Sequence, residues 1–161
     1  MSRTGLWDSH AHLDSDYFTD DRDELIAKIG EEMEGFINPG CDETSSAFAV
    51  QLAEKYDFVY AAVGWHPEEL AGIKDEHYLD KLAAWAVHQK VAAIGEIGLD
   101  YYWKENEPKE VQKKRLLLSR KSSHFQSTDD PELFILDLPL CVKITFLYFF
   151  SLEITHYIFG V

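Results

Sequence analysis

Residues 91–97 read VAAIGEI, an apolar run that contains one glutamate and continues into Gly98 and Leu99. Short runs rich in Val, Ile and Ala are typical of strands that are buried on both faces of a parallel sheet. Similar runs lie at residues 5–13, 35–40 and 58–64. Each run is followed by a segment with helical periodicity, and this repeated order predicts βα units that build a parallel sheet.

The helical segments carry start signals of known types. We expect Thr19 or Asp20 to cap the first helix and Asp42 to cap the second. The third helix is predicted to follow Asp75, and the fourth to begin near Pro108, since proline is well placed in a first turn. The sequence therefore predicts four βα units within its first 114 residues.

The charge of the chain restricts its partners. The net charge is −14, with 29 acidic and 15 basic residues. Such a charge repels polyanions, so nucleic acid is not expected to bind through a basic surface, and a phosphate-containing substrate would need bound cations. The two cysteines, Cys41 and Cys141, form no metal-binding or disulfide pattern, which favours a reducing, cytoplasmic setting.

Membrane insertion is not expected. The N-terminal residues lack the apolar region of a signal peptide. The apolar run at residues 133–150 is interrupted by two charged residues and a proline, which disfavours a spanning helix. We expect this run to be a buried strand pair or part of a disordered, aggregation-prone tail.

Three motifs at predicted strand ends carry candidate functional residues. Residues 8–14 read DSHAHLD, and His10 and His12, two positions apart on a strand, would reach one metal ion from the same face. Glu96 lies in an apolar run between glycines, where a buried carboxylate needs a cation or hydrogen-bond donors. His66, in VGWHP at residues 63–67, would touch a substrate phosphate or donate a proton.

Each motif also has a structural interpretation. The two histidines could be exposed or hydrogen-bonded without a metal, and Glu96 could lie solvated at the rim of the sheet or pair with a lysine. His66 precedes a proline and could be a turn residue. The convergence of three such motifs on the carboxyl ends of strands, where α/β folds place their sites, favours a function.

Together, DSHAHLD at 8–14, VGWHPEE at 63–69 and AIGEIGLDYY at 93–102 resemble the TatD family of metal-dependent deoxyribonucleases. The resemblance covers about residues 5–114 and implies a β/α barrel that hydrolyses phosphodiester bonds in DNA through a metal-activated water. It implies that His10, His12 and Glu96 hold one or two divalent ions (Mg, Mn or Zn), that Glu96 is catalytic, and that His66 contacts substrate. Members of the broader superfamily that act on cyclic amides often use a carbamylated lysine as the bridging ligand. The strand of Glu96 contains no lysine between residues 91 and 102, so the resemblance implies an ester such as DNA or another phosphodiester and not a ring amide.

A complete eight-stranded barrel needs about 250 residues, and this chain has 161. We therefore expect an α/β fold that forms the first half of a TIM-type (β/α)8 barrel. Composition changes after Lys114: the net charge is −13 before it and −1 after it, and every alanine precedes it. We expect residues 1–114 to form the half-barrel and residues 115–161 to be a divergent tail, either frameshifted or disordered.

Besides a membrane-associated function that would depend on the apolar run at residues 133–150, two functions remain open for such a chain. One is a truncated metal-dependent hydrolase that completes its wall by self-association through unpaired sheet edges. The other is a catalytically inactive remnant that keeps a partial metal site. The sequence itself does not place the histidines and aspartate that the family uses after the fourth helix.

Overall fold

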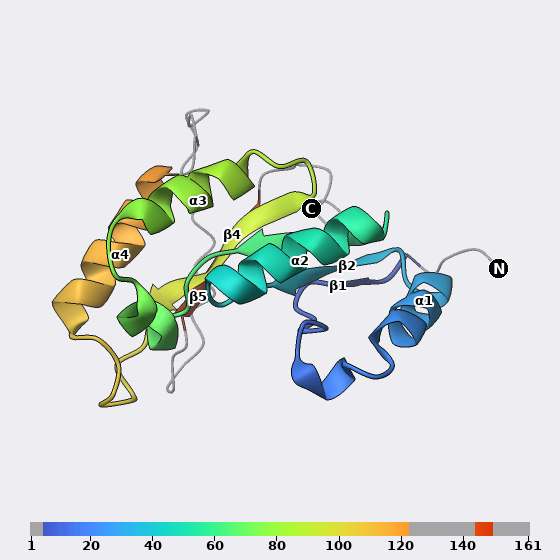
Figure 1. The fold of residues 1–161 in the computed structure, drawn as a ribbon, viewed down its shortest axis with the longest axis horizontal. Coiled ribbons are helices and arrows are strands. Elements are labelled where there is room, and N and C mark those ends of the chain that lie inside the picture. Colours follow the sequence, from blue (N-terminus) through green and yellow to red (C-terminus); the bar gives the residue numbers. More distant parts are fainter. Residues whose placement is uncertain (1–4, 123–143, 150–161) are drawn as a thin grey trace.

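The computed structural model describes residues 5–122 and 144–149, which form one sheet with helices packed against it (Figure 1). The strands are β1 (Trp7–Asp8), β2 (Gly35–Pro39), β3 (Val59–Val63), β4 (Val91–Leu99) and β5 (Ile144–Phe149). They lie side by side in the order β1-β2-β3-β4-β5, and the first four are parallel. The predicted α/β fold with four βα units is confirmed.

The four helices alternate with the strands, as predicted: α1 (Arg22–Glu32), α2 (Glu43–Lys55), α3 (His77–Ala86) and α4 (Lys109–Ser122). Short 3-10 helices, η1 (Asp16–Phe18) and η2 (Pro67–Gly72), follow the first and third strands. Figure 1 shows α2 running along β2 and β3. Helix α4 continues across residue 114, and the division of the chain there into two domains stays a prediction.

The helix starts agree with the sequence in part. The Asp42 side chain accepts a hydrogen bond from the Ser45 N–H (2.7 Å), and the Ser45 hydroxyl accepts one from the Asp42 N–H (3.0 Å), which completes a capping box. The predicted cap at Thr19 or Asp20 is wrong, because α1 begins after Asp21. The Thr19 hydroxyl instead donates to the Asp16 carbonyl at 2.8 Å and closes η1.

The core lies mainly between the sheet and the helices. Alternate strand residues such as Phe36, Val59 and Val63 are buried against Ile26 and Leu82 of the helices. Their neighbours along the strands belong to a separate, smaller cluster formed by Ile37, Ala62, Ala92 and Ala93. The sheet is thus apolar on both faces, as the continuous apolar runs predict.

Strand β5 corrects the expectation that both edges of the four-stranded sheet are unpaired. It runs antiparallel to β4, with Ile144 opposite Leu99 and Phe149 opposite Ala93. Its sequence, ITFLYF, is rich in the β-branched and aromatic residues that favour strands, so it covers the β4 edge. Self-association through the remaining β1 edge stays a prediction.

Several expectations concern residues outside the described ranges. They are those for the residues of the apolar run at 133–150 that lie outside β5. Among residues 5–122 and 144–149, no helix has the length and apolar character needed to cross a membrane.

Candidate metal centre

Three of the predicted site residues come together at the carboxyl ends of β1 and β4. His10, His12 and Glu96 each offer one ligand atom, and these atoms lie within 4.8 Å of one another. The Nε2 atoms of His10 and His12 are 3.1 Å apart, and His10 Nε2 lies 3.3 Å from Glu96 Oε1. The histidine side chains are 42% and 38% exposed and the glutamate side chain 7%, so solvent reaches the site from the histidine side.

The cluster depends on the curvature of the sheet. Two strands, β2 and β3, separate β1 from β4. At a spacing of about 4.8 Å per strand, a flat sheet would hold the two strands about 14 Å apart. The 3.3 Å contact between His10 and Glu96 therefore requires a curled sheet, which is the geometry of a barrel wall.

The histidines do not lie within a strand, which corrects the predicted strand at residues 5–13. β1 ends at Asp8, whose carboxylate accepts the His10 N–H at 2.9 Å. Beyond it, the Ala11 N–H still donates to the Ile37 carbonyl at 3.0 Å. The chain thus follows β2 without regular pairing, and the two rings converge although they are not held by the pleat of a strand.

Asp14 and Asn38 fix the orientation of His12. Asp14 Oδ1 lies 3.6 Å from His12 Nδ1 and accepts a hydrogen bond from Asn38 Nδ2 at 3.0 Å. The interaction with Asp14 holds the pKa of His12 above its usual value. Burial acts to raise the pKa of Asp14, but the bonds from His12 and Asn38 outweigh it and lower that pKa. Asp14 thereby leaves His12 Nε2 directed toward the cluster.

Asn38 was not identified from the sequence. It is fully buried in β2, and its Oδ1 also accepts the Leu13 N–H at 2.7 Å. One amide therefore binds both the backbone and the carboxylate of the segment that carries the histidines. A polar residue within the buried strand GFINP is the signal that could have indicated it.

Glu96 occupies a strained position. Its φ is +56°, in the left-handed region that non-glycine residues rarely adopt, and the register between β4 and β5 shifts between Ile94 and Ile97. The neighbouring Gly95 carbonyl lies against Gly64, which follows β3, and a Cβ on Gly64 would lie 2.0 Å from that oxygen. Strain of this kind is concentrated at functional sites.

The Glu96 carboxylate is suited to a cation. Its Oε1 is buried and makes no hydrogen bond within the described part of the chain, although it lies beside the His10 ring. A buried carboxylate oxygen without a donor is costly unless a positive charge faces it. Two imidazole nitrogens and this oxygen form a donor set that divalent metal ions take in proteins.

His66 lies at the same end of the sheet but outside the cluster of three. It follows β3, and its Nδ1 accepts the Glu68 N–H at 3.3 Å, which caps η2. Its main-chain N–H donates to the Cys41 carbonyl at 2.7 Å. The turn role is therefore present, and the contact of His66 with substrate stays a prediction.

Comparison with solved structures supports the half-barrel. The TatD homologue YJJV from Escherichia coli K12 is similar with a TM-score of 0.65 and 29% identity, over 73% of this chain and 46% of that chain. A hydrolase of the TatD family from Entamoeba histolytica also gives a TM-score of 0.65, with 26% identity over 74% of this chain and 46% of that one. The described fold corresponds to about half of each.

Sequence comparisons agree. The uncharacterized metal-dependent hydrolase YabD of Bacillus subtilis is 40% identical over 111 residues, which are 67% of this chain and 42% of that protein. The 3'-5' ssDNA/RNA exonuclease TatD of Salmonella typhimurium is 28% identical over 109 residues, with the same shares. The chain thus spans less than half the length of these relatives. The family model described as TatD related DNase matches residues 7–119, and the chain belongs to this family.

Proposed function

We propose that this chain is a metal-dependent hydrolase that cleaves phosphodiester bonds in DNA, with His10, His12 and Glu96 as metal ligands. The observation that carries the proposal is the convergence of three ligand atoms within 4.8 Å, one of them a buried carboxylate oxygen without a hydrogen bond. The similarity to proteins named as metal-dependent hydrolases and as a nucleic-acid exonuclease supports it.

Each residue has a distinct task in this proposal. The neutral Nε2 atoms of His10 and His12 bind the cation, and Asp14 keeps His12 in the tautomer that this needs. When bound, a divalent cation supplies a nucleophilic water at neutral pH and offsets negative charge on the phosphate. Glu96 contributes the negative ligand and an oxygen that can hold the attacking water, which makes it the proposed catalytic residue. His66 contributes a ring nitrogen to the substrate phosphate.

The donor set bears on the identity of the ion. Imidazole nitrogen suits Zn, whereas Mg and Mn prefer oxygen ligands. With two imidazoles and one carboxylate, we propose Zn ahead of Mn and Mg. Three protein ligands leave positions for water and substrate, which is typical of catalytic rather than structural zinc sites.

The experiment measures bound metal and hydrolysis of bis(p-nitrophenyl) phosphate, a phosphodiester without bases, by the purified full chain. We expect metal binding and turnover in the wild type, and loss of at least 100-fold of the turnover in His10→Ala and Glu96→Gln, because the cation and its ligands supply the nucleophile. His88→Ala is the matched control, since this histidine pairs with Glu54 (3.1 Å) and does not belong to the cluster. Wild-type activity no higher than that of Glu96→Gln would refute the proposal.

A second candidate is an inactive chain that retains a partial metal site. It needs only the three ligand atoms of the described cluster, which can hold one ion whether or not hydrolysis follows. This candidate predicts stoichiometric metal binding, lost in His10→Ala, together with no hydrolysis above background. The same two measurements therefore separate the candidates.

A further inference from the structure

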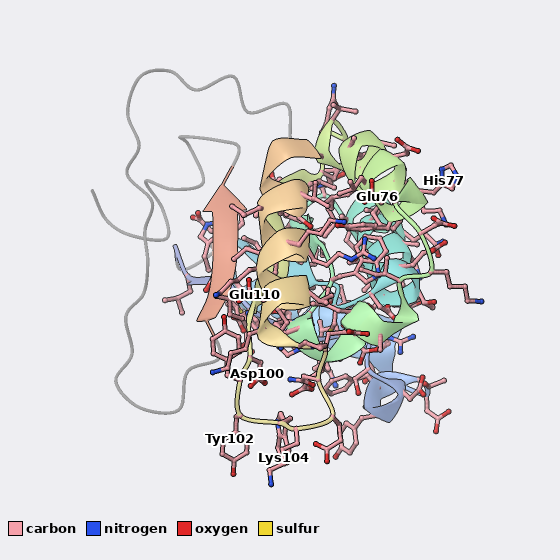
Figure 2. The ribbon with its side chains drawn as sticks, turned by 90° about the vertical axis from the view of Figure 1, so that its left-hand side faces the viewer. Glu76, His77, Asp100, Tyr102, Lys104 and Glu110 are labelled. Carbon is pink, nitrogen blue, oxygen red and sulfur yellow. The ribbon has the colours of Figure 1, made fainter. Side chains whose placement is uncertain are left out.

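A loop of exposed aromatic side chains follows β4. Tyr101, Tyr102 and Trp103 are consecutive, and they are 43%, 67% and 51% exposed. Figure 2 shows Tyr102 and the adjacent Lys104 at the far end of this loop, pointing away from the helices and the sheet. A group of large aromatic side chains exposed together often marks an interaction site, whereas a single exposed one is common.

The loop is held rigidly by one side chain. The amide of Gln112, which is fully buried in α4, accepts the Asp100 N–H (2.8 Å) and donates to the carbonyls of Asp100 (2.9 Å) and Glu107 (2.7 Å). The Asp100 carboxylate in turn accepts the Tyr102 N–H at 2.8 Å. Both ends of the loop are thus fixed, so the aromatic rings are displayed on a preorganised support, which lowers the entropic cost of binding.

The loop lies near the metal centre. It leaves the carboxyl end of β4, the strand that carries Glu96, and this is the end at which His10 and His12 also lie. Trp103 lies seven positions after Glu96, which limits their Cα distance to about 25 Å even for an extended chain. A short oligonucleotide can span this distance.

The charges near the loop indicate which part of a nucleic acid it would contact. Lys104 and Lys109 are accompanied by Glu105, Glu107 and Glu110, and the chain as a whole carries −14. Contacts to phosphates through surface cations are therefore weak here, and affinity must come from the bases. Lys109 Nζ lies 4.5 Å from the centroid of the Tyr101 ring, in a cation–π contact. Its charge is therefore engaged with the ring and is not a separate phosphate-binding site.

We propose that Tyr101, Tyr102 and Trp103 form a platform on which the unpaired bases of single-stranded nucleic acid stack, while the backbone runs toward the metal centre. The role of this platform in catalysis rests on the proposed function, whereas binding itself does not require hydrolysis. Duplexes are disfavoured because their bases are already stacked within the helix. Stacking tolerates any base, so the platform selects single strands over duplexes without a preference for sequence.

The test is fluorescence anisotropy with a labelled dT12 oligonucleotide in EDTA, which prevents metal-dependent cleavage. We expect Trp103→Ala and Tyr102→Ala each to weaken binding about 5- to 150-fold, the range for loss of one stacking contact. Trp103→Phe should retain most of the affinity. Val87→Ala is the matched control, because Val87 is 71% exposed but lies beyond the carboxyl end of α3, at the opposite end of the sheet.

An abasic 12-mer separates bases from phosphates. We expect it to bind as weakly as dT12 binds to the aromatic variants, and we expect log K for dT12 to fall with log salt with a slope no steeper than about −1.4, the value for two phosphate contacts. Equal affinity for the abasic and dT12 strands would overturn the proposal. A second result would also overturn it: alanine variants that unfold at the same temperature as the wild type and bind dT12 normally, but no longer self-associate in sedimentation. The loop would then be a contact between copies of the chain.

The two proposals fail in different ways. Aromatic variants that keep hydrolysis of bis(p-nitrophenyl) phosphate but lose dT12 binding support the platform. If the wild type hydrolyses nothing and dT12 binding still depends on Trp103, the proposed function fails and the platform stands. If the wild type hydrolyses bis(p-nitrophenyl) phosphate and the aromatic variants bind dT12 as tightly as the wild type, only the platform is refuted.

Discussion

The left-handed backbone at Glu96 predicts an unusual order of stability for two substitutions that both remove the carboxylate. In this conformation a Cβ lies close to the following carbonyl oxygen, which costs about 1–2 kcal/mol. Glu96→Ala keeps this penalty, whereas Glu96→Gly removes it. Glycine loses more freedom on folding, which offsets about 0.5–1 kcal/mol of the gain. We therefore expect the glycine variant to be more stable by about 1 kcal/mol, although alanine is the more stable residue at an ordinary strand position.

The assay is urea unfolding followed by far-ultraviolet circular dichroism, with EDTA in both samples. For an m-value of about 1–3 kcal/mol/M, a difference of about 1 kcal/mol moves the midpoint by about 0.3–1 M in favour of Glu96→Gly. The φ of +56° is the sole reason for this order, since both variants lack the same buried charge. An alanine variant as stable as the glycine variant, or more stable, would refute the reasoning.

The same samples test the metal site. With metal at 100 times its dissociation constant, the wild type should gain about 2.7 kcal/mol of stability over its EDTA value. Neither Glu96→Gly nor Glu96→Ala should show this gain at that concentration, because each has lost the buried oxygen ligand. Equal stabilisation of all three proteins would mean that Glu96 is not a ligand.

Three further substitutions or modifications have defined outcomes. Gly64→Ala should lower the free energy of unfolding by about 1–3 kcal/mol or more in urea, because its Cβ would lie 2.0 Å from the Gly95 carbonyl oxygen, whereas Gly72→Ala, which faces open space, should have little effect. Asp42→Ala should cost about 1 kcal/mol in the same measurement through loss of the capping box, and an unchanged midpoint would contradict that bond pattern. Burial, with nearby carboxylates, raises the pKa of the Cys41 thiol to about 11. At pH 8 its alkylation should be roughly 200-fold slower than that of an ordinary thiol and should rise about tenfold per pH unit; mass-spectrometric mapping of each cysteine peptide measures this, and a rate independent of pH would count against it.

The fold was predictable because each βα unit has a local sequence pattern, an apolar run followed by a segment with helical periodicity. Buried parallel strands are continuous apolar runs, and Asp42 is a typical N-cap residue placed directly before the second helical segment. The pairing of β5 with β4 was not predictable, since strand partners are chosen by tertiary structure and not by the run itself. The first strand was overestimated for a related reason: the residues after Asp8 form single bonds to β2 without a regular ladder.

The candidate cluster joins three of the residues predicted from the sequence, whereas its geometry was not predictable. His10 and His12 follow β1, Glu96 lies toward the carboxyl end of β4, and parallel strands bring such ends to one edge. The left-handed φ of Glu96 has no sequence signal, because glutamate does not favour that region. The role of Asn38 depends on the fold placing its amide against Leu13 and Asp14, 25 and 24 residues earlier in the sequence, which only the folded chain reveals.

Because β1 is short, docking of this strand and metal binding at the candidate centre depend on each other. This strand contributes two residues to the sheet, yet the segment just after it carries two of the three ligands. A cation shared by His10 and Glu96 would join positions 86 residues apart, and because these ligands come together only when the first strand is docked, the free energy of metal binding would stabilise the docked state. Fraying of the first strand and release of the ion are then a single linked equilibrium, so metal occupancy reports directly on whether the first edge of the sheet is docked.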